Sequence, residues 1–412
     1  MEGKSTFPIP WSAWSGETTL DLTFSNAVNA ELVSSNQTEP WTSKQIGEAI
    51  ANPIEKDRIR EAASGARSAC IAVDDLARPT RAGDVLPLIL EELNAAGVSP
   101  AQCSIVIAVG THGALSEQQI EAKIGAEALG SGAAIEIHGP DKLAGTAIQY
   151  GDQELQINQS FLEADFKLGV SSVLPHSFAG FSGGAKMMLP GLSNLEATVR
   201  SHKFVQMGLR SGSGLEKNRF RNEIERLARK LGFEYTVCVL SDSRRRTNGV
   251  YAGDIVSAHR VACAEATKQF ESVTRGVFDA MVLNAYPKDT DLVQAENALI
   301  AFKSSGFGVV KESGVIVICT AASELGVHGL FAPGGASYRE PAPNRALRGR
   351  DLWIFAPNLS TETVRKRYWV GYRHLKSTLE LEKALIEKVG AGSRVGVLPT
   401  APMQQISIYA RA

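Results

Sequence analysis

Short apolar runs alternate with amphipathic segments along most of this sequence, and no other feature restricts the possible folds as strongly. The run Cys70–Val73 has the length and composition of a buried strand. The next segment, Asp84–Ala96, repeats apolar residues at helical spacing and is followed by Gly97, a residue typical of helix ends. Strands that alternate with helices pack as α/β layers around mainly parallel sheets. We therefore expect an α/β fold.

The alternation continues along the chain and divides into two series. Further expected elements are the strands Ile105–Val109, Ile135–Ile137, Phe166–Val173, Met281–Asn284, Val315–Cys319 and Leu352–Phe355, a helix from Glu117, a helix over Asp291–Lys303 and helices within Thr361–Val389. A helical pattern ends between Phe270 and Phe278, before a new strand. We predict an N-terminal α/β domain over residues 1–272, with short strands around Leu20–Phe24, and a C-terminal α/β domain over residues 273–412. The final strand is free to return to the first domain.

Charge and cysteine content exclude several classes of protein. Lys and Arg number 43 and Asp and Glu number 44, so the net charge of −1 provides no basic surface for nucleic acid or an acidic membrane. The one dense basic run, Arg244–Arg246, predicts a solvated turn, with a phosphate contact as the alternative. No stretch reaches the ~18 consecutive apolar residues of a membrane helix, and no signal-peptide pattern is present. The five cysteines are far apart, which favours buried reduced thiols in a cytoplasmic protein.

Ionisable side chains follow four of the expected strands. Ligands of parallel α/β sheets bind beyond the carboxyl ends of the strands, so these segments predict a shared site. The segments are Asp74–Thr80, Gly110–Gly113, Pro175–Lys186 and Tyr286–Asp289.

Each of these side chains also has an ordinary structural interpretation. Asp75 and Arg78 could form a surface ion pair worth about 0–1 kcal/mol, or the aspartate could close a turn. His112 could bond a backbone carbonyl, whereas His176 follows a proline and precedes a glycine-rich loop, which favours a functional role. The remaining histidines stand outside these segments, and we assign structural or surface roles to His138, His259, His328 and His374.

The loop Gly180–Lys186 is the strongest local signal. Glycines allow positive φ and close approach of the backbone to a ligand, and successive N–H groups in such a loop can form an anion nest. The loop is not a nucleotide-binding P-loop, because Met187 follows the lysine where that pattern requires Ser or Thr. Methionines beside Lys186 predict partial desolvation, which lowers the pKa of an amine and makes it a nucleophile or attachment point. The alternative is a lysine that extends into water.

A further histidine, His202, follows the loop in a predicted helix over Leu195–Met207 that begins near Asn194. Alone it is an ordinary helix histidine. A soft metal centre nevertheless accepts imidazole as a ligand.

These motifs, in this order, resemble the nickel-dependent lactate racemase family. The matching segments are Asp-Asp-x-x-Arg-Pro at Asp74–Pro79, Gly-Thr-His at Gly110–His112, the lysine loop at Pro175–Lys186, Met188–Gly191, the later His202, and Tyr286–Gln294. The resemblance covers about Val73 to Ala298, and the order of the motifs suggests that it extends over the whole chain.

The resemblance implies two α/β domains with an active-site cleft between them, and a nickel-pincer nucleotide bound covalently to Lys186. It implies that His202 is the nickel ligand, that His112 and His176 are the acid/base pair, and that Asp75, Gly183 and Gly184 lie at the cofactor. Arg78 and Gln294 are then substrate-binding residues. The implied activity is inversion of C2 of a 2-hydroxy acid by reversible hydride transfer. Cofactor maturation enzymes are the implied partners.

One position departs from the family pattern. Members that act on lactate carry a lysine three residues after the glutamine, and here Asn297 stands in its place. A cation near the substrate carboxylate is lost and an amide is gained, although Lys288 could partly compensate. We therefore count Asn297 among the substrate-binding residues and expect a larger or more polar substrate than lactate, such as a sugar acid.

Two other functions remain open at the level of sequence. Zinc prefers three close protein ligands and a water, and His112, His176 and His202 could provide them in a zinc hydrolase. A cofactor-free relative that only binds a small acid is the second alternative. Retention of both histidines and of Lys186 argues against the second.

Overall fold

The computed structural model describes residues 4–36, 38–203, 211–212 and 215–409, and the chain forms two compact units. Unit 2 is continuous and spans residues 38–266. Unit 1 is discontinuous and combines residues 1–37 with residues 267–412.

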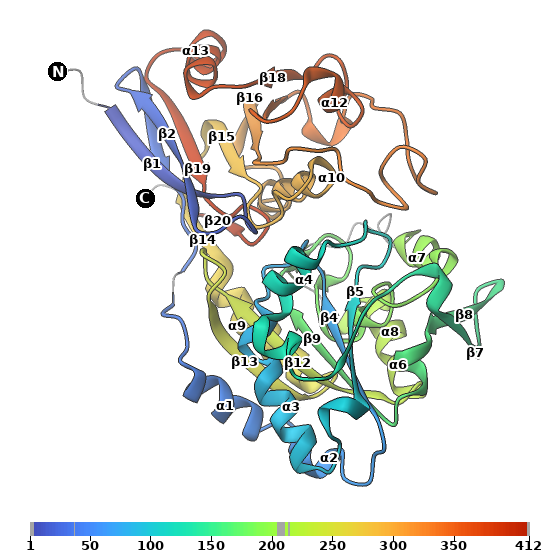
Figure 1. The fold of residues 1–412 in the computed structure, drawn as a ribbon. Helices are drawn as coiled ribbons and strands as arrows, with labels where there is room; N and C mark the ends of the chain where they lie inside the picture. The colour runs from blue at the N-terminus through green and yellow to red at the C-terminus, as the bar shows by residue number, and fades with distance from the viewer. Residues whose placement is uncertain (1–3, 37, 204–210, 213–214, 410–412) are drawn as a thin grey trace. The chain divides into compact units, whose positions relative to one another are not determined.

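Unit 2 is built on a six-stranded sheet whose strand order is β13-β12-β9-β4-β5-β6 (Figure 1). All neighbouring strands are parallel except β12 and β13. The strands are β4 (Ala69–Asp74), β5 (Cys103–Ala108), β6 (Ala134–Ile137), β9 (Phe166–Ser172), β12 (Phe233–Ser241) and β13 (Thr247–Asp254). Residues of β4 are buried on both faces, as parallel strands covered by helices on both sides require.

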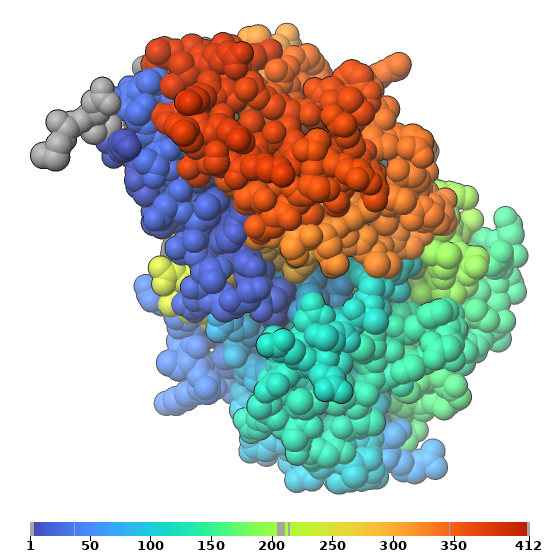
Figure 2. All heavy atoms as spheres, turned by 45° about the horizontal axis from the view of Figure 1, so that its top comes forward, coloured from blue at the N-terminus to red at the C-terminus, as the bar shows by residue number. Residues whose placement is uncertain are grey.

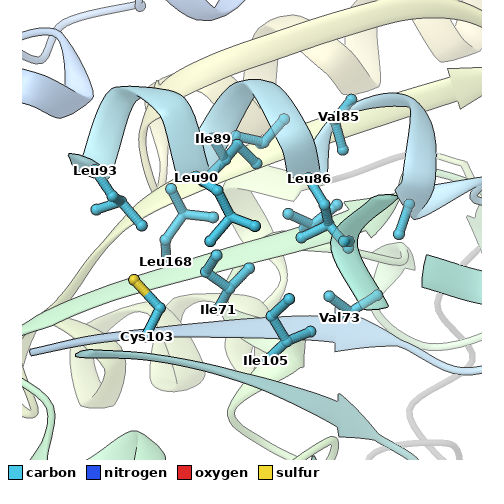
Figure 3. Packing of buried hydrophobic residues seen from close by; sticks show 14 of the residues in the cluster. Ile71, Val73, Val85, Leu86, Ile89, Leu90, Leu93, Cys103, Ile105 and Leu168 are labelled. Atoms are coloured by element: carbon cyan, nitrogen blue, oxygen red, sulfur yellow. The ribbon is translucent and has the colours of Figure 1, made fainter. Parts of the chain in front are cut away.

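Helices cover both faces of this sheet. One face packs against α1 (Ser43–Ala51), α2 (Ile59–Ala62) and α3 (Leu86–Ala95), and the other against α6 (Gln159–Glu163), α7 (Leu195–His202) and α8 (Arg219–Lys230). Figure 3 shows Leu86, Leu90 and Leu93 of α3 directed at the sheet, where Ile71 and Ile105 lie side by side in parallel register. The helical spacing in the sequence therefore corresponds to the buried face of α3. Further helices of the unit are α4 (Glu117–Ile124), α5 (Ala126–Leu129) and α9 (Ser257–Phe270).

Unit 1 contains a second six-stranded sheet, in which all neighbouring strands are parallel, with the order β18-β17-β16-β15-β19-β3. These strands are β3 (Val28–Leu32), β15 (Phe278–Asn284), β16 (Val310–Cys319), β17 (Asp351–Phe355), β18 (Arg373–Leu375) and β19 (Ser393–Leu398). The other elements of the unit are the hairpin β1 (Lys4–Trp11) and β2 (Thr18–Ser25), the parallel pair β14 (Glu271–Arg275) and β20 (Gln405–Tyr409), and the helices α10 (Leu292–Ala295), α11 (Leu299–Ser304), α12 (Thr361–Arg365) and α13 (Thr378–Val389).

The N-terminal strands belong to unit 1, which differs from the division at residue 272 that the sequence suggested. Strand β3 pairs with β19, and Ile9, Leu22 and Phe24 of the hairpin pack in one apolar cluster with Val282. In Figure 2 these N-terminal residues, in blue, lie beside the red C-terminal residues of the same unit. The final strand β20 pairs with β14, and both strands belong to unit 1.

Most of the expected elements are present, and several details differ. The helix expected over Asp291–Lys303 consists of α10, a 3₁₀ turn and α11. The basic run forms a turn, but Arg245 is 6% exposed and has positive φ, so the solvated interpretation was wrong for that residue. All five cysteines are free and buried, as expected. None of the helices in the described ranges is both long and apolar enough to span a membrane.

Candidate active site

The carboxyl ends of β9, β4 and β5 bring three of the predicted segments to one edge of the unit 2 sheet. These strands are neighbours in the sheet and run parallel. Asp75 and Arg78 follow β4, His112 follows β5, and the segment from His176 to Lys186 follows β9. The expectation that strand exits meet therefore holds for this unit.

Asp75 and His112 form a hydrogen-bonded pair. The Asp75 carboxylate accepts from Nδ1 of His112, and the aspartate is 7% exposed. Burial raises the pKa of Asp75, but the charge and hydrogen bond of His112 lower it further, to about 2. Because Nδ1–H is directed at a carboxylate, Nε2 is the ring nitrogen that can take up a proton. Asp75 is therefore neither a surface ion-pair partner nor a simple turn cap.

A second buried carboxylate, Asp74, precedes Asp75 in the chain and fixes the backbone beside this pair. Its Oδ2 accepts from Thr80 Oγ1 at 2.8 Å and from the backbone N–H of Ser172 at 2.8 Å. Lys123, which is fully buried, places Nζ 2.6 Å from Asp74 Oδ1 and donates to the carbonyl of Asp75 at 3.0 Å. The ends of β4 and β9 are thereby tied to α4, which fixes the backbone that carries Asp75.

The Phe178 ring lies at the centre of the lysine loop. Its centroid is 4.6 Å from that of His176, 5.0 Å from that of His202 and 5.2 Å from that of Phe220. Nζ of Lys186 lies 5.0 Å from the same centroid. One aromatic ring thus contacts two of the predicted histidines and the predicted attachment lysine.

The side chain of Lys186 is buried and does not extend into solvent. The residue is 7% exposed, and its Nζ also lies 5.4 Å from the Phe220 ring centroid. Burial first, and then the charges of Arg221 and Arg78, lower the pKa of this amine well below its usual value. A lowered pKa favours the uncharged form of the amine, which is the nucleophilic form.

His202 is the last residue of α7, and its ring is oriented by its own helix. Nδ1 bonds the carbonyl of Thr198 at 2.8 Å, so Nε2 carries the lone pair of the neutral ring. Burial is the main cause that lowers the pKa of His202 to about 4, with smaller contributions from the charges of Lys186 and His112. A neutral imidazole whose other nitrogen bonds a carbonyl is the usual form of a metal ligand. The expected extension of this helix to Met207 lies outside the described residues.

The two glycines expected at the cofactor have positive φ, but they pack against protein. A Cβ at Gly183 would lie 2.9 Å from Ser171 Oγ, and a Cβ at Gly184 would lie 3.0 Å from the His259 ring. Several N–H groups of the loop bond protein acceptors, as Ser182 does to Leu174 and Gly184 to Ser171. These glycines serve the close packing of the loop on the protein behind it, and the anion nest finds no support at those N–H groups.

Gln294 and Asn297 lie in unit 1, on α10 and the 3₁₀ turn after it. The Asn297 amide donates to the carbonyl of Gln294 at 2.8 Å and to its Oε1 at 3.3 Å. Asn297 therefore orients the Gln294 side chain. Lys288, in the same unit, is 2% exposed.

No group of three metal-binding side chains among His, Cys, Asp and Glu is present in the part of the chain that the structure describes. A zinc hydrolase needs three protein ligands, so this alternative lacks its ligand set. A centre that takes one imidazole from the protein and its other ligands from a cofactor is compatible with His202. The buried amine of Lys186 and the oriented ring of His202 fit such a cofactor.

Sequence reasoning missed four residues that build the site: Phe178, Phe220, Arg221 and Lys123. The first lies inside the recognised loop, but nothing in its spacing marks a ring that contacts two histidines. The others lie in helices and resemble ordinary helix residues in the sequence. Their role depends on tertiary packing, for which no local signal exists.

Comparisons with known proteins agree with this architecture. Residues 15–214 match the family model of the lactate racemase N-terminal domain. The lactate racemase of Thermoanaerobacterium thermosaccharolyticum is 28% identical over 288 residues, and that of Lactiplantibacillus plantarum is 26% identical over 286 residues. Each match covers 68% of this chain and 66% of the relative, just under two thirds of its length.

Two solved structures share the fold. The lactate racemase apoprotein from Thermoanaerobacterium thermosaccharolyticum matches with a TM-score of 0.74 and 21% identity, over 98% of this chain and 100% of that one. A protein from Thermotoga maritima matches with a TM-score of 0.67 and 15% identity, over 90% of this chain and 100% of that one.

The fold and the site define the class of this protein: a two-unit α/β protein that gathers a buried lysine and three histidines at the carboxyl edge of a parallel sheet. Its sequence matches and its fold are those of the racemases above. The chain is similar to the lactate racemases in sequence over residues 15–214 and shares their fold.

Proposed function

We propose that this protein is a racemase or epimerase that inverts C2 of a 2-hydroxy acid, with a nickel-pincer nucleotide attached to Lys186. The observation that carries the proposal is the buried Lys186 amine beside Phe178, whose ring also contacts His176 and His202. Similarity to the curated lactate racemases supports the reaction class. When bound, the cofactor supplies a nickel-assisted hydride acceptor, the part of the chemistry that protein side chains lack.

His112 and His176 are the proposed proton-transfer groups. Removing hydride from C2 makes the hydroxyl proton acidic, and a base must take it up. Inversion needs such a group for each enantiomer, and this chain offers two histidines. His112 can take the proton at Nε2, because Asp75 holds the proton on Nδ1. The Nδ1 of His176 accepts the N–H of Ala179 at 3.4 Å, so in the neutral ring Nε2 carries the proton and is the nitrogen that can donate it.

Arg78 is the proposed anchor of the substrate carboxylate. Its Nη1 donates to the carbonyl of Ala77 at 2.9 Å, which fixes one side of the guanidinium. The planar group offers further donors in a fork that suits a carboxylate. Binding the carboxylate at a fixed point allows the oxo acid to turn and present its other face.

His202 is the proposed nickel ligand, and Lys186 the attachment point. The bond from His202 to the Thr198 carbonyl keeps Nε2 in the form that binds metal. Burial of the Lys186 amine, which lowers its pKa, favours the nucleophilic form that covalent attachment requires.

A substrate larger or more polar than lactate remains part of the proposal. Asn297 replaces a lysine and bonds Gln294, so this pair offers amide groups where lactate racemases offer a cation. Amide groups suit substrate hydroxyls.

The test uses protein produced together with the cofactor maturation enzymes and a panel of single-enantiomer 2-hydroxy acids, with products separated by chiral chromatography. We expect inversion at C2, and we expect it to be faster for an acid with several hydroxyl groups, such as a sugar acid, than for lactate. Replacing His112 or His176 by Asn is expected to lower turnover by on the order of 10²–10⁴-fold. Fastest turnover of lactate would reject the substrate class, and loaded protein that inverts none of the panel would reject the function.

A further inference from the structure

A fully buried arginine lies directly behind the lysine loop. Arg221 belongs to the first turns of α8 and is 0% exposed. Its Nη1 donates to the carbonyl of Gly183 at 2.9 Å, and its Nη2 donates to the carbonyl of Phe181 and, at 3.5 Å, to that of Ala179. One guanidinium thus binds three carbonyl oxygens of a five-residue stretch.

The remaining carbonyls of the loop are bound by other donors. Asn218 Nδ2 donates to the carbonyl of Phe178 at 2.8 Å, Gly212 N to that of Gly180 at 2.7 Å and His259 Nε2 to that of Ser182 at 2.8 Å. Each carbonyl from residue 178 to residue 183 therefore accepts a hydrogen bond. Arg221 binds three of these six carbonyls, although those of Ala179 and Gly183 also accept the N–H groups of Phe181, at 2.9 Å, and Lys186, at 3.4 Å. Asn218 and His259 bind one carbonyl each, so Arg221 is the side chain that makes the most contacts with this stretch.

A buried guanidinium is costly, and no carboxylate fully compensates it here. The nearest acidic group, Glu225, lies 3.9 Å from Nε of Arg221 and is bound more closely by Arg260, at 2.9 and 2.8 Å. Burying a charge without a close partner costs several kcal/mol. A neutral side chain would avoid that cost, but it has no planar fork that reaches three carbonyls at once.

Helix α8 also contributes a wall of the lysine environment. Phe220, adjacent to Arg221, places its ring centroid 5.4 Å from Lys186 Nζ and 5.2 Å from the Phe178 ring. The loop, through Phe178, and the helix, through Phe220, thus both contribute to the surroundings of the amine. Hydrogen bonds from Arg221 and from Asn218, the N-cap of α8, connect this helix to the loop.

We propose that Arg221 is a positioning residue for Lys186: by holding the carbonyls of Ala179, Phe181 and Gly183 it fixes the loop so that the amine lies beside the rings of Phe178 and Phe220. This inference rests on the proposed function, in which that amine carries the cofactor. The electrostatic effect agrees in direction, since Arg221 is the largest cause after burial that lowers the pKa of Lys186. Arg221 acts through the loop and touches no reacting atom.

The test compares Arg221→Met, Arg221→Lys and the control Arg226→Met, which alters an exposed arginine of the same helix. The first readout is hydrogen–deuterium exchange of the peptide covering residues 176–188, in protein made without the maturation enzymes. The second is the fraction of chains that carry an adduct on Lys186 after co-production, from intact mass. Thermal unfolding of every variant verifies that folded protein is compared.

We expect Arg221→Met to raise exchange of the loop amides about tenfold and to lower adduct occupancy about tenfold, with Arg226→Met unchanged. Arg221→Lys keeps the charge but not the fork, so an intermediate result is expected. If Arg221→Met does not fold, loop exchange and adduct occupancy are compared between Arg221→Lys and Arg226→Met, and the same two outcomes decide the inference. Unchanged loop exchange and occupancy in a folded Arg221 variant would overturn the inference. Absence of any adduct on wild-type protein would overturn the proposed function instead, and the exchange data would still decide whether Arg221 fixes the loop.

Discussion

The pairing of Asp75 with His112 determines what the histidine can do. A neutral imidazole has one donor and one acceptor nitrogen, and the carboxylate assigns the donor role to Nδ1. The lowered pKa of Asp75, about 2, keeps this group ionised throughout the neutral range. The orientation of the ring therefore depends on a residue that does not need to contact substrate.

We predict that Asp75→Asn lowers the turnover of the loaded enzyme by about 100-fold while adduct occupancy stays near that of the wild type. The physical reason is that an amide no longer selects the tautomer of His112, an effect typically worth about 10–100-fold at comparable sites. The measurement is the initial rate of C2 inversion together with intact mass. Asp141→Asn, an exposed aspartate of the same unit, is the control. Wild-type turnover in Asp75→Asn would refute the proposed role of this pair.

At the residue scale, the sequence predicted the groups with distinctive chemistry and missed those that position them. Lys186 and His112 were recognised because they follow strands in unusual motifs. Lys123 was missed because a single lysine in an amphipathic helix is an ordinary surface residue, and only the folded chain places it beside Asp74. Gly183 and Gly184 pack against Ser171 and His259, which accounts for the absence of a side chain there, and their place at the cofactor stays a prediction.

The junction between α2 and α3 is held by an ion-pair cluster centred on one buried carboxylate. Glu92 of α3 binds Arg58 at 2.6 Å and Arg60 at 2.5 Å, and its side chain is 6% exposed. Burial raises the pKa of Glu92, but the hydrogen bonds and charges of the two arginines lower it further, to about 2. The cluster fixes one end of the helix that covers β4 and β5.

We predict that Glu92→Gln lowers the free energy of unfolding at pH 7 by about 1 kcal/mol, a modest value because both guanidinium groups are partly exposed. The folded-state pKa of Glu92 is lower than the unfolded one, so the folded state binds fewer protons. The stabilisation is therefore present above about pH 4 and is lost as the pH falls towards 2. Urea unfolding at pH 7 and pH 3 measures the difference.

The matched control is Glu91→Gln, an exposed glutamate of the same helix. We expect it to have little effect at either pH. A loss for Glu92→Gln that is as large at pH 3 as at pH 7 would contradict the ionic origin of the stabilisation.

Elements with strong periodicity were predictable, and those defined by pairing were not. The strands β4, β5, β9, β15 and β16 and the helix α3 lie where their apolar patterns indicate. The hairpin β7 (Leu143–Tyr150) and β8 (Gln153–Asn158) was missed, because its residues alternate only weakly between buried and exposed. Short strands gain their stability from the partner strand, which a local pattern does not contain.

At the scale of the whole molecule, residues 1–37 belong to unit 1, residues 38–266 form unit 2, and residues 267–412 complete unit 1. The sequence placed the boundary near residue 272, close to residue 267 of the structure, but assigned the first residues to the wrong side. Strand β3 is an edge strand, so its five residues give no sign of which sheet they join. Topology of this kind depends on contacts between residues more than 350 positions apart, such as Val28 and Ser393.

We predict that residues 38–266 fold without the rest of the chain, because unit 2 has its own sheet and its own apolar clusters. Residues 267–412 alone should unfold with little cooperativity, because they lack β3 and the hairpin that covers one face of their sheet. Thermal unfolding of both fragments by circular dichroism checks this. Adding residues 1–37 to the second fragment by a short linker is expected to restore a cooperative transition. A cooperative transition in residues 267–412 alone would contradict the assignment of the N-terminal strands.

The central claim is that Lys186 carries a nickel-containing nucleotide, and intact-protein mass spectrometry with metal analysis tests it most directly. Wild-type protein and Lys186→Arg, each produced with the cofactor maturation enzymes, should differ in one respect. We predict a mass increase located on the Lys186 peptide, with nickel in proportion to it, in the wild type and neither in the variant. An adduct on another residue, or zinc without any adduct, would contradict the account.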